Sequence, residues 1–264
     1  MTLKSLLHRL IDRALRQLAE IFGLRLLPTV LHGKLCWFDV SYWSSCYSRY
    51  EPSMAKCLNS HLREVSTFFD IGAHAGIWSV YASKVMGKGG KIFSFEPSQA
   101  FSLLEGNVKA LPSVTPFRMG LGDANAEMTF YGQGIASHGS LVAAVTEINK
   151  AWFPDTSVKP MQVAIRRLDD ICRERSVYPD FIKLDVEGYE MKVFQGAREV
   201  ITRARPYWIV EVHPTQLKLS GDSDEAFLKL VRSFGYQVEE LDRNPNGIYT
   251  ILLTPSDISA KKAA

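Results

Sequence analysis

The sequence predicts an α/β fold built around a mostly parallel, doubly wound sheet. The main observation is the stretch 68–80, an apolar run that ends in Asp70, turns through Gly72 and Gly76, and continues with the apolar spacing of a helix. This succession of strand, tight glycine turn and helix is typical of the first βα unit of a nucleotide-binding sheet. The free N–H groups at such a helix start are available to a ligand.

Two further observations support the same fold. The strand-like run 91–95 ends in Glu96 and Pro97, and an acid at the tip of a second strand suits the hydroxyl pair of a ribose. Near the end of the chain, the apolar runs 236–241 and 248–253 flank the turn sequence Asn-Pro-Asn-Gly. A closing antiparallel hairpin is therefore expected at one edge of the sheet.

The elements between these landmarks follow from periodicity and from the residues that break it. Short apolar runs bounded by Gly, Pro or charged residues predict strands, and apolar residues spaced by three or four predict helices. The predicted strands are 65–71, 91–95, 114–119, 128–131, 163–165, 181–184, 207–212, 236–241 and 248–253. The predicted helices are 3–27, 53–63, 78–86, 101–110, a helix that begins at 168, 191–203 and 224–234.

Three segments together resemble a known family. The segments Phe69–Gly76, Phe95–Pro97 and Phe181–Glu190 resemble the FkbM-type methyltransferases, which belong to the class I S-adenosylmethionine-dependent enzymes. The resemblance runs from about residue 65 to about residue 253, and its most specific part is the Asp-Val-Glu-Gly-x-Glu sequence after the fourth strand of the fold. It implies a Rossmann-like class I methyltransferase domain with a seven-stranded, mostly parallel sheet whose final strand is antiparallel. It also implies S-adenosylmethionine as cofactor.

The predicted domain organisation has three parts. We expect a helical and aromatic N-terminal extension over 1–64, a class I methyltransferase domain over 65–255 and a tail over 256–264. Within the extension, residues 3–27 have the apolar stripe of an amphipathic helix, with basic residues mostly off it. Such a helix packs on its own domain or on a partner subunit in most proteins, but a basic one can also rest on an anionic membrane.

Composition narrows the function classes. A net charge of +3, without a Lys/Arg stripe interleaved with aromatics, disfavours a nucleic-acid partner. The four cysteines show no C-x-x-C spacing and favour reduced thiols in a cytoplasmic protein, with disulfides or zinc as the minor alternatives. The sequence contains no apolar run of membrane-spanning length, so any membrane contact is expected to be peripheral, through residues 3–27 at the inner membrane surface.

The predicted cofactor site lies at the carboxyl ends of the strands, where ligands bind in open α/β sheets. Acids dominate this rim, which suits the sulfonium and ammonium groups of the methyl donor and suits a dinucleotide pyrophosphate poorly. For Asp123, contact with the adenine amino group and a solvated turn position remain equally weighted. The predicted cofactor-binding residues are Asp70, Gly72, Ala73, Gly76, Glu96, Pro97, Asp123 and Asp185.

Catalysis requires alignment of acceptor and methyl group and, for a hydroxyl acceptor, removal of a proton. The candidate bases are Asp185, Glu187 and His213, which the predicted strand order brings to neighbouring strand tips. Asp185 can instead be structural or donor-binding, and His213 can be a satisfied loop histidine. If a helix starts at Glu190, the role of this residue can be limited to capping the turn. Some O-methyltransferases of this fold hold a divalent metal ion near the tips of the fourth and fifth strands, which in this sequence carry Asp185 and Glu211. No decisive ligand set is visible here, and no metal is predicted.

Three functions compete at this point. The resemblance implies an O-methyltransferase that acts on a hydroxyl of a sugar, glycolipid or polyketide, so a small-molecule, glycan or glycolipid acceptor is the expected partner. The alternatives are a nicotinamide-dependent oxidoreductase, disfavoured by the acidic rim and the Gly-x-x-x-Gly turn, and a non-catalytic donor-binding module used for assembly.

Overall fold

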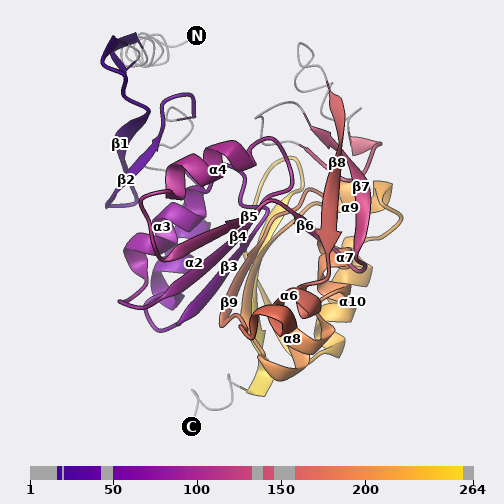
Figure 1. Cartoon of the computed structure of the whole chain (residues 1–264). Coiled ribbons are helices and arrows are strands. Elements are labelled where there is room, and N and C mark those ends of the chain that lie inside the picture. The colour runs from indigo at the N-terminus through magenta and orange to yellow at the C-terminus, as the bar shows by residue number, and fades with distance from the viewer. Residues whose placement is uncertain (1–16, 20, 43–49, 133–138, 146–157, 258–264) are drawn as a thin grey trace.

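The computed structural model describes residues 17–19, 21–42, 50–132, 139–145 and 158–257. Its centre is a seven-stranded sheet with the strand order β11-β12-β10-β9-β3-β4-β5 (Figure 1). The strands are β3 (Thr67–Ile71), β4 (Lys91–Phe95), β5 (Val114–Phe117), β9 (Phe181–Leu184), β10 (Tyr207–Val212), β11 (Tyr236–Arg243) and β12 (Tyr249–Pro255). Pairing is parallel from β10 to β5, and β12 is antiparallel to both β10 and β11. The predicted mostly parallel sheet with an antiparallel final strand is confirmed.

Helices cover both faces of this sheet and separate its core into two clusters. One face is packed by α2 (Pro52–His61), α3 (Ile77–Val85) and α4 (Phe101–Val108). The other face is packed by α6 (Leu168–Arg175), α7 (Glu190–Gln195), α8 (Arg198–Arg203), α9 (Pro214–Leu219) and α10 (Asp224–Ser233), as Figure 1 shows. No helix within the described ranges is long and apolar enough to cross a membrane.

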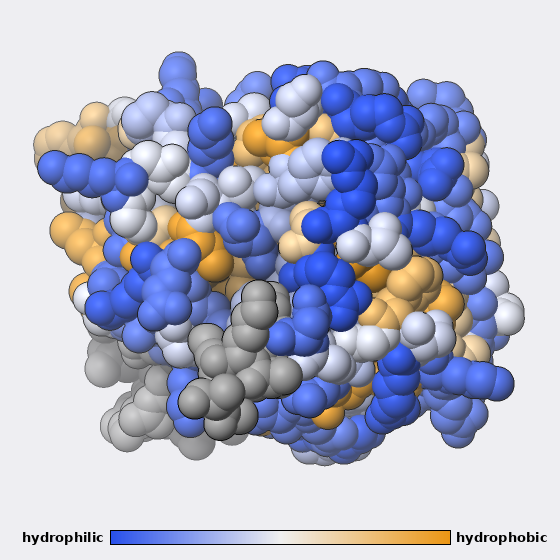
Figure 2. Space-filling view, turned by 90° about the horizontal axis from the view of Figure 1, so that it is seen from below, coloured by the Kyte–Doolittle hydropathy of each residue, from blue (hydrophilic) through white to orange (hydrophobic). Residues whose placement is uncertain are grey.

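Two small sheets are attached to this three-layer body. The strands β6 (Gly120–Leu121), β7 (Ala126–Gly132) and β8 (Lys159–Arg166) form one of them, with β8 in the middle. The strands β1 (Leu26–Leu31) and β2 (Lys34–Asp39) form an antiparallel hairpin. On the face drawn in Figure 2, hydrophilic residues dominate and hydrophobic residues form small groups between them, as on ordinary protein surfaces.

The hairpin corrects the expectation of a helix up to residue 27. Most of the predicted helix 3–27 lies outside the described residues. Its described end is helical at residues 17–19 and 21, and β1 already begins at Leu26. The hairpin forms because the turn His32-Gly33 has two positive φ angles (44° and 77°), as a two-residue turn of type I′ requires. The buried residues Leu31, Cys36 and Phe38 attach the hairpin to the core beside α3 and α4.

A second correction concerns the helix predicted over 191–203, which is two helices, α7 and α8. The break falls at Gly196, where a Cβ atom would lie 1.9 Å from the carbonyl oxygen of Gly122. The amide of Asp169 also donates to the Gly196 carbonyl. The chain therefore bends to let the loop after β6 approach the backbone. The helix α9, which starts at Pro214 directly after β10, was not predicted.

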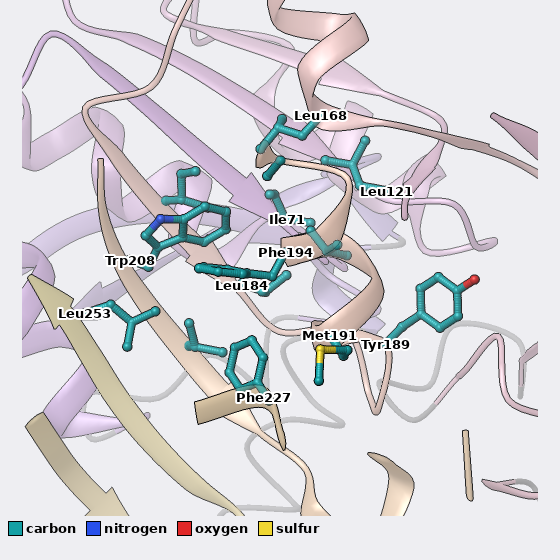
Figure 3. Packing of buried hydrophobic residues seen from close by; sticks show 14 of the residues in the cluster. Ile71, Leu121, Leu168, Leu184, Tyr189, Met191, Phe194, Trp208, Phe227 and Leu253 are labelled. Carbon is teal, nitrogen blue, oxygen red and sulfur yellow. The ribbon is translucent and has the colours of Figure 1, made fainter. Parts of the chain in front are cut away.

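Aromatic side chains fill the larger of the two core clusters. Figure 3 shows Phe194 between Trp208 and Phe227, and its ring centroid lies 5.3 Å and 5.7 Å from theirs. All three residues are fully buried. Interlocked rings of this kind leave a void when one is truncated, because neighbours relax only in part.

Phe194→Ala is therefore expected to lower the free energy of unfolding by about 3–5 kcal/mol. The matched control is Phe22→Ala, because Phe22 is 70% exposed and its truncation should change stability by no more than about 0.5 kcal/mol. Urea unfolding of both variants measures the difference. Equal losses in the two variants would contradict this packing.

Candidate functional site

The candidate site is a cavity of about 570 Å³ at the carboxyl ends of β3, β4, β9 and β10. It contains most of the residues that the sequence predicted for binding and catalysis. Those that line it are Gly72, Ala73, Glu96, Pro97, Asp185, Glu187 and His213. Clefts with convergent polar groups at this edge of an α/β sheet are the usual place for a ligand.

The glycine turn brings two strand tips into contact. Gly72 has a φ of +74°, and a Cβ atom there would lie 1.7 Å from the carbonyl oxygen of Asp185. The amides of Gly72 and Ala73 both donate to the carbonyl oxygen of Phe95, each at 3.0 Å. Only glycine fits this approach, so the turn fixes the end of β3 against the ends of β4 and β9.

Glu96 is held rigidly at the tip of β4. Its two carboxylate oxygens accept hydrogen bonds from the backbone amides of His74 (2.8 Å) and Ser98 (2.9 Å). The side chain is almost fully buried and still lines the cavity. Each oxygen keeps a second lone pair, so the carboxylate can also accept from hydroxyl groups of a ligand.

A buried ammonium group joins the sheet to the cavity floor. Lys183 donates to the carbonyl oxygen of Gly72 at 2.7 Å and lies 3.2 Å from Asp185 and 3.5 Å from Asp70. Burial acts to lower the pKa of Lys183, but the two carboxylates outweigh it and raise the pKa above its ordinary value. Asp70 is fully buried, accepts from Ser79 at 2.5 Å, and lies outside the cavity lining. Its contact with the cavity is therefore indirect, through Lys183.

His213 is surrounded by carboxylates. Its Nδ1 lies 2.7 Å from Glu190, and its Nε2 lies 3.5 Å from Glu187, 3.8 Å from Glu211 and 3.9 Å from Asp185. Burial favours the neutral ring, but these acids raise the pKa of His213 well above its ordinary value. Glu190 also accepts from the amide of Gly188, so it caps the turn, as weighed above, and in addition fixes the imidazole.

The pKa values of the cavity carboxylates are shifted in opposite directions. For Asp185, burial acts to raise the pKa, but Lys183 and His213 outweigh it and lower the pKa. For Glu211, burial and the charge of Asp185 raise the pKa to about 8. Burial and Asp185 also raise the pKa of Glu51, whose carboxylate accepts from Trp78 at 3.0 Å. A strong acid and a weak acid are thus placed side by side.

Several residues of this cluster were not predicted as site residues. Lys183 lies two residues before the most specific sequence segment, but a lysine within an apolar strand did not reveal that its ammonium group turns to the strand tips. Glu51 lies far away in sequence and reaches the cavity from the N-terminus of α2. The acid of Glu211 was visible at the end of β10, but its raised pKa depends on neighbours that only the fold brings together.

Besides Asp70, two more of the predicted cofactor-binding residues lie outside the cavity lining. Gly76 starts α3 with a φ of +80°, and a Cβ atom there would lie 2.6 Å from Leu104, so this glycine lets α3 and α4 approach. Asp123 is a partly exposed residue that pairs with Lys192 at 3.6 Å. Its contact with an adenine group remains a prediction, and the surface pair favours the alternative of a solvated turn residue.

The aromatic segment before α2 contributes to the cavity wall in part. Tyr42 and Tyr50 line the cavity, and their rings lie 5.1 Å from His74 and 5.9 Å from Trp78 respectively. The intervening residues 43–49 lie outside the described part of the chain. Aromatic faces of this kind can pack against an organic ligand.

One group of side chains has the composition of a metal site. Asp185, Glu211 and His213 offer ligand atoms that all lie within 4.8 Å of one another. Oxygen and imidazole ligands suit several divalent cations. The ammonium group of Lys183, 3.2 Å from Asp185, already supplies positive charge there, and the expectation of no metal stays a prediction.

The raised pKa of Glu211 predicts a specific pH dependence of stability. The folded protein keeps a proton on Glu211 up to about pH 8, whereas the unfolded chain releases it near the ordinary value of 4.5. This contribution to stability is complete below the unfolded pKa and is lost as the pH rises through the folded pKa. Glu211→Gln should therefore gain stability relative to the parent protein between about pH 5 and about pH 9. Urea unfolding at both pH values measures the change, and a constant difference would contradict the assignment.

Comparison with known proteins places this site in a family. Residues 70–238 match the family model described as the methyltransferase FkbM domain. The chain is 30% identical over 156 residues to the 2-O-methyltransferase NoeI of Sinorhizobium fredii, and the aligned region covers 54% of this chain and 62% of that protein. It is 26% identical over 168 residues to the hexuronic acid methyltransferase AglP of Haloferax volcanii, and the aligned region covers 62% of this chain and 63% of that protein.

The chain thus spans a little over three fifths of the length of each of these relatives. Among solved structures, the methyltransferase FkbM from Methylobacillus flagellatus KT is similar, with a TM-score of 0.48 and 15% identity over 81% of this chain and 52% of that chain. Because the family model covers well over half of the 264 residues, the chain belongs to the FkbM methyltransferase domain family.

Proposed function

We propose that this protein is an S-adenosylmethionine-dependent O-methyltransferase whose acceptor is a hydroxyl group of a sugar or glycolipid. The observation that carries the proposal is the cavity in which the glycine turn, Glu96 and the carboxylate cluster meet at the strand tips. Membership of the FkbM family supports methyl transfer. The names of the two relatives, a 2-O-methyltransferase and a hexuronic acid methyltransferase, support a sugar-type acceptor.

The residues of the cavity fit the methyl donor. Glu96 keeps free lone pairs for the ribose hydroxyls, and the absence of a side chain at Gly72 keeps the turn close to the strand tips. Asp185, with its lowered pKa, is a fixed negative charge at the cavity wall. Negative charge stabilises a bound sulfonium and ammonium group. When bound, S-adenosylmethionine supplies an activated methyl group, and the protein has to align the acceptor and accept its proton.

The proton acceptor that we propose is Glu211. A general base works best when its pKa lies near the working pH, and burial beside Asp185 raises the pKa of Glu211 to about 8. Asp185 is a weaker base because its pKa is lowered, and His213 holds its own proton because its pKa is raised. We therefore give Asp185 and His213 orienting roles, and Glu187 a place beside His213 at the acceptor side.

The two alternative functions fit less well. An oxidoreductase would bring a pyrophosphate to a cavity lined by Glu96, Asp185 and Glu187, where like charges repel. A non-catalytic assembly module would have no need for carboxylates whose pKa values are displaced in opposite directions.

Glu96→Ala tests the donor site. Loss of the carboxylate removes charge-assisted hydrogen bonds of about 1.5–3 kcal/mol each, so the dissociation constant for S-adenosylmethionine should rise tenfold or more. Isothermal calorimetry measures it, and Glu105→Ala on the exposed side of α4 serves as a matched control. The melting temperature of each variant shows whether the fold is kept. An unchanged affinity in folded Glu96→Ala would exclude Glu96 from the donor site.

Glu211→Gln tests the proton acceptor. In the parent protein kcat/KM for a confirmed acceptor should rise with pH to a plateau above about pH 8, because the carboxylate becomes the base as it loses its proton. Glu211→Gln should lower turnover by about 10²-fold or more at the plateau and remove this pH dependence. Exposed Glu127→Gln is the control. If Glu211→Gln keeps the parent rate and profile, the base is another residue.

A further inference from the structure

Large exposed hydrophobic side chains are concentrated at one place in the described part of the chain. Apart from Leu219, every such residue lies between positions 18 and 37. We call this set the N-terminal apolar surface, and its members are Leu18, Ile21, Phe22, Leu24, Val30, Leu35 and Trp37, each between 47% and 75% exposed. Single exposed hydrophobic residues are ordinary, but a group of this size within one segment is typical of an interaction site.

The pairing of the hairpin explains why its part of this surface is continuous. Val30 lies opposite Leu35 in the register of β1 and β2, and Trp37 is two residues further along the same face of β2. Directly opposed residues of an antiparallel pair point to the same face. The other face carries buried residues such as Cys36 and Phe38, which pack on the core. One face of the hairpin is therefore packed against the core, and the opposite face is apolar and exposed.

The helix end adds to the same surface. Ile21 and Phe22 are 75% and 70% exposed, and Leu24 is 51% exposed. The amide of Leu24 donates to the carbonyl of Ala19, which fixes the short link between the helix end and the start of β1. Figure 1 shows the hairpin at the upper left, on the side of the molecule away from α9 and α10. The apolar side chains thus come from two neighbouring elements at one extremity.

The charge of this segment favours an anionic partner. Residues 1–39 contain six Lys or Arg and three Asp or Glu, an excess of +3 that equals the net charge of the whole chain. The remaining 225 residues are therefore balanced. The basic residues are Lys4, Arg9, Arg13, Arg16, Arg25 and Lys34. An excess of basic residues in the same stretch of sequence as exposed hydrophobic and Trp side chains is typical of segments that bind the surface of an anionic membrane.

We propose that the N-terminal apolar surface docks on an anionic lipid bilayer, with Leu35 and Trp37 inserted at the level of the headgroups. A second copy of the chain is the weaker candidate, because a symmetric dimer through this segment would bring two positively charged segments together. The proposal does not depend on the methyl-transfer chemistry, since none of these side chains lines the cavity. It concerns only where the protein is held.

The test is flotation of the full chain with vesicles of phosphatidylcholine alone or with added phosphatidylglycerol. The parent protein should bind the anionic vesicles at least tenfold more strongly than the neutral ones. The double variant Leu35→Thr/Trp37→Thr keeps the β propensity of β2 and should bind the anionic vesicles at least tenfold more weakly. Leu219→Thr, which removes the exposed hydrophobic side chain on α9, should bind like the parent.

A second double variant, Ile21→Ser/Phe22→Ser, changes the helix end without touching the hairpin and should weaken binding in the same way. Thermal unfolding confirms that each variant is folded. The proposal is overturned if the parent fails to bind anionic vesicles, if it binds neutral vesicles equally well, or if folded double variants bind as the parent does. Self-association that the double variants abolish, without vesicle binding by the parent, would assign the surface to a second copy instead.

Discussion

The site depends on one buried ammonium group. Lys183 lies opposite Asp70 in the register of β9 and β3, and it reaches the Gly72 carbonyl and Asp185 at the strand tips. A charge in this position is tolerated only because several acceptors surround it, and loss of one partner would leave the others unpaired. The same residue therefore joins the two central strands, fixes the glycine turn and sets the charge state of a cavity carboxylate.

The arrangement extends outward from this lysine in both directions. Asp70 accepts from Ser79, which also contacts Ser94, so the network connects β3 to α3 and β4. Among the described residues that line the cavity, acidic side chains outnumber lysine and arginine side chains. Burial raises the pKa of Glu211, and the nearby negative charges raise it further. For His213, burial acts to lower the pKa, but the surrounding acids outweigh it and raise the pKa. A cationic ligand relieves this crowding, which is the physical basis for the proposed donor.

Much of this could be predicted from the sequence, and the limits have physical causes. The strands of the central sheet are visible because both faces are covered, so they appear as short apolar runs such as 181–184. Residues that lie at their own strand tip and line the cavity, such as Glu96 and Asp185, follow directly from that pattern. The predicted elements were wrong where the chain depends on distant contacts: the helix breaks at Gly196 because of Gly122, and the hairpin replaces the end of a helix. The sequence also did not reveal that Asp70 lies outside the cavity lining and accepts from Ser79.

We expect the carboxylate-lined cavity to accept a cationic methyl donor and to reject an anionic dinucleotide. Isothermal calorimetry of the parent protein with S-adenosylmethionine and, separately, with NAD tests this selectivity. The parent protein should bind S-adenosylmethionine saturably and should show no measurable binding of NAD under the same conditions. Binding of NAD, or a complete lack of binding of S-adenosylmethionine to the folded protein, would contradict it.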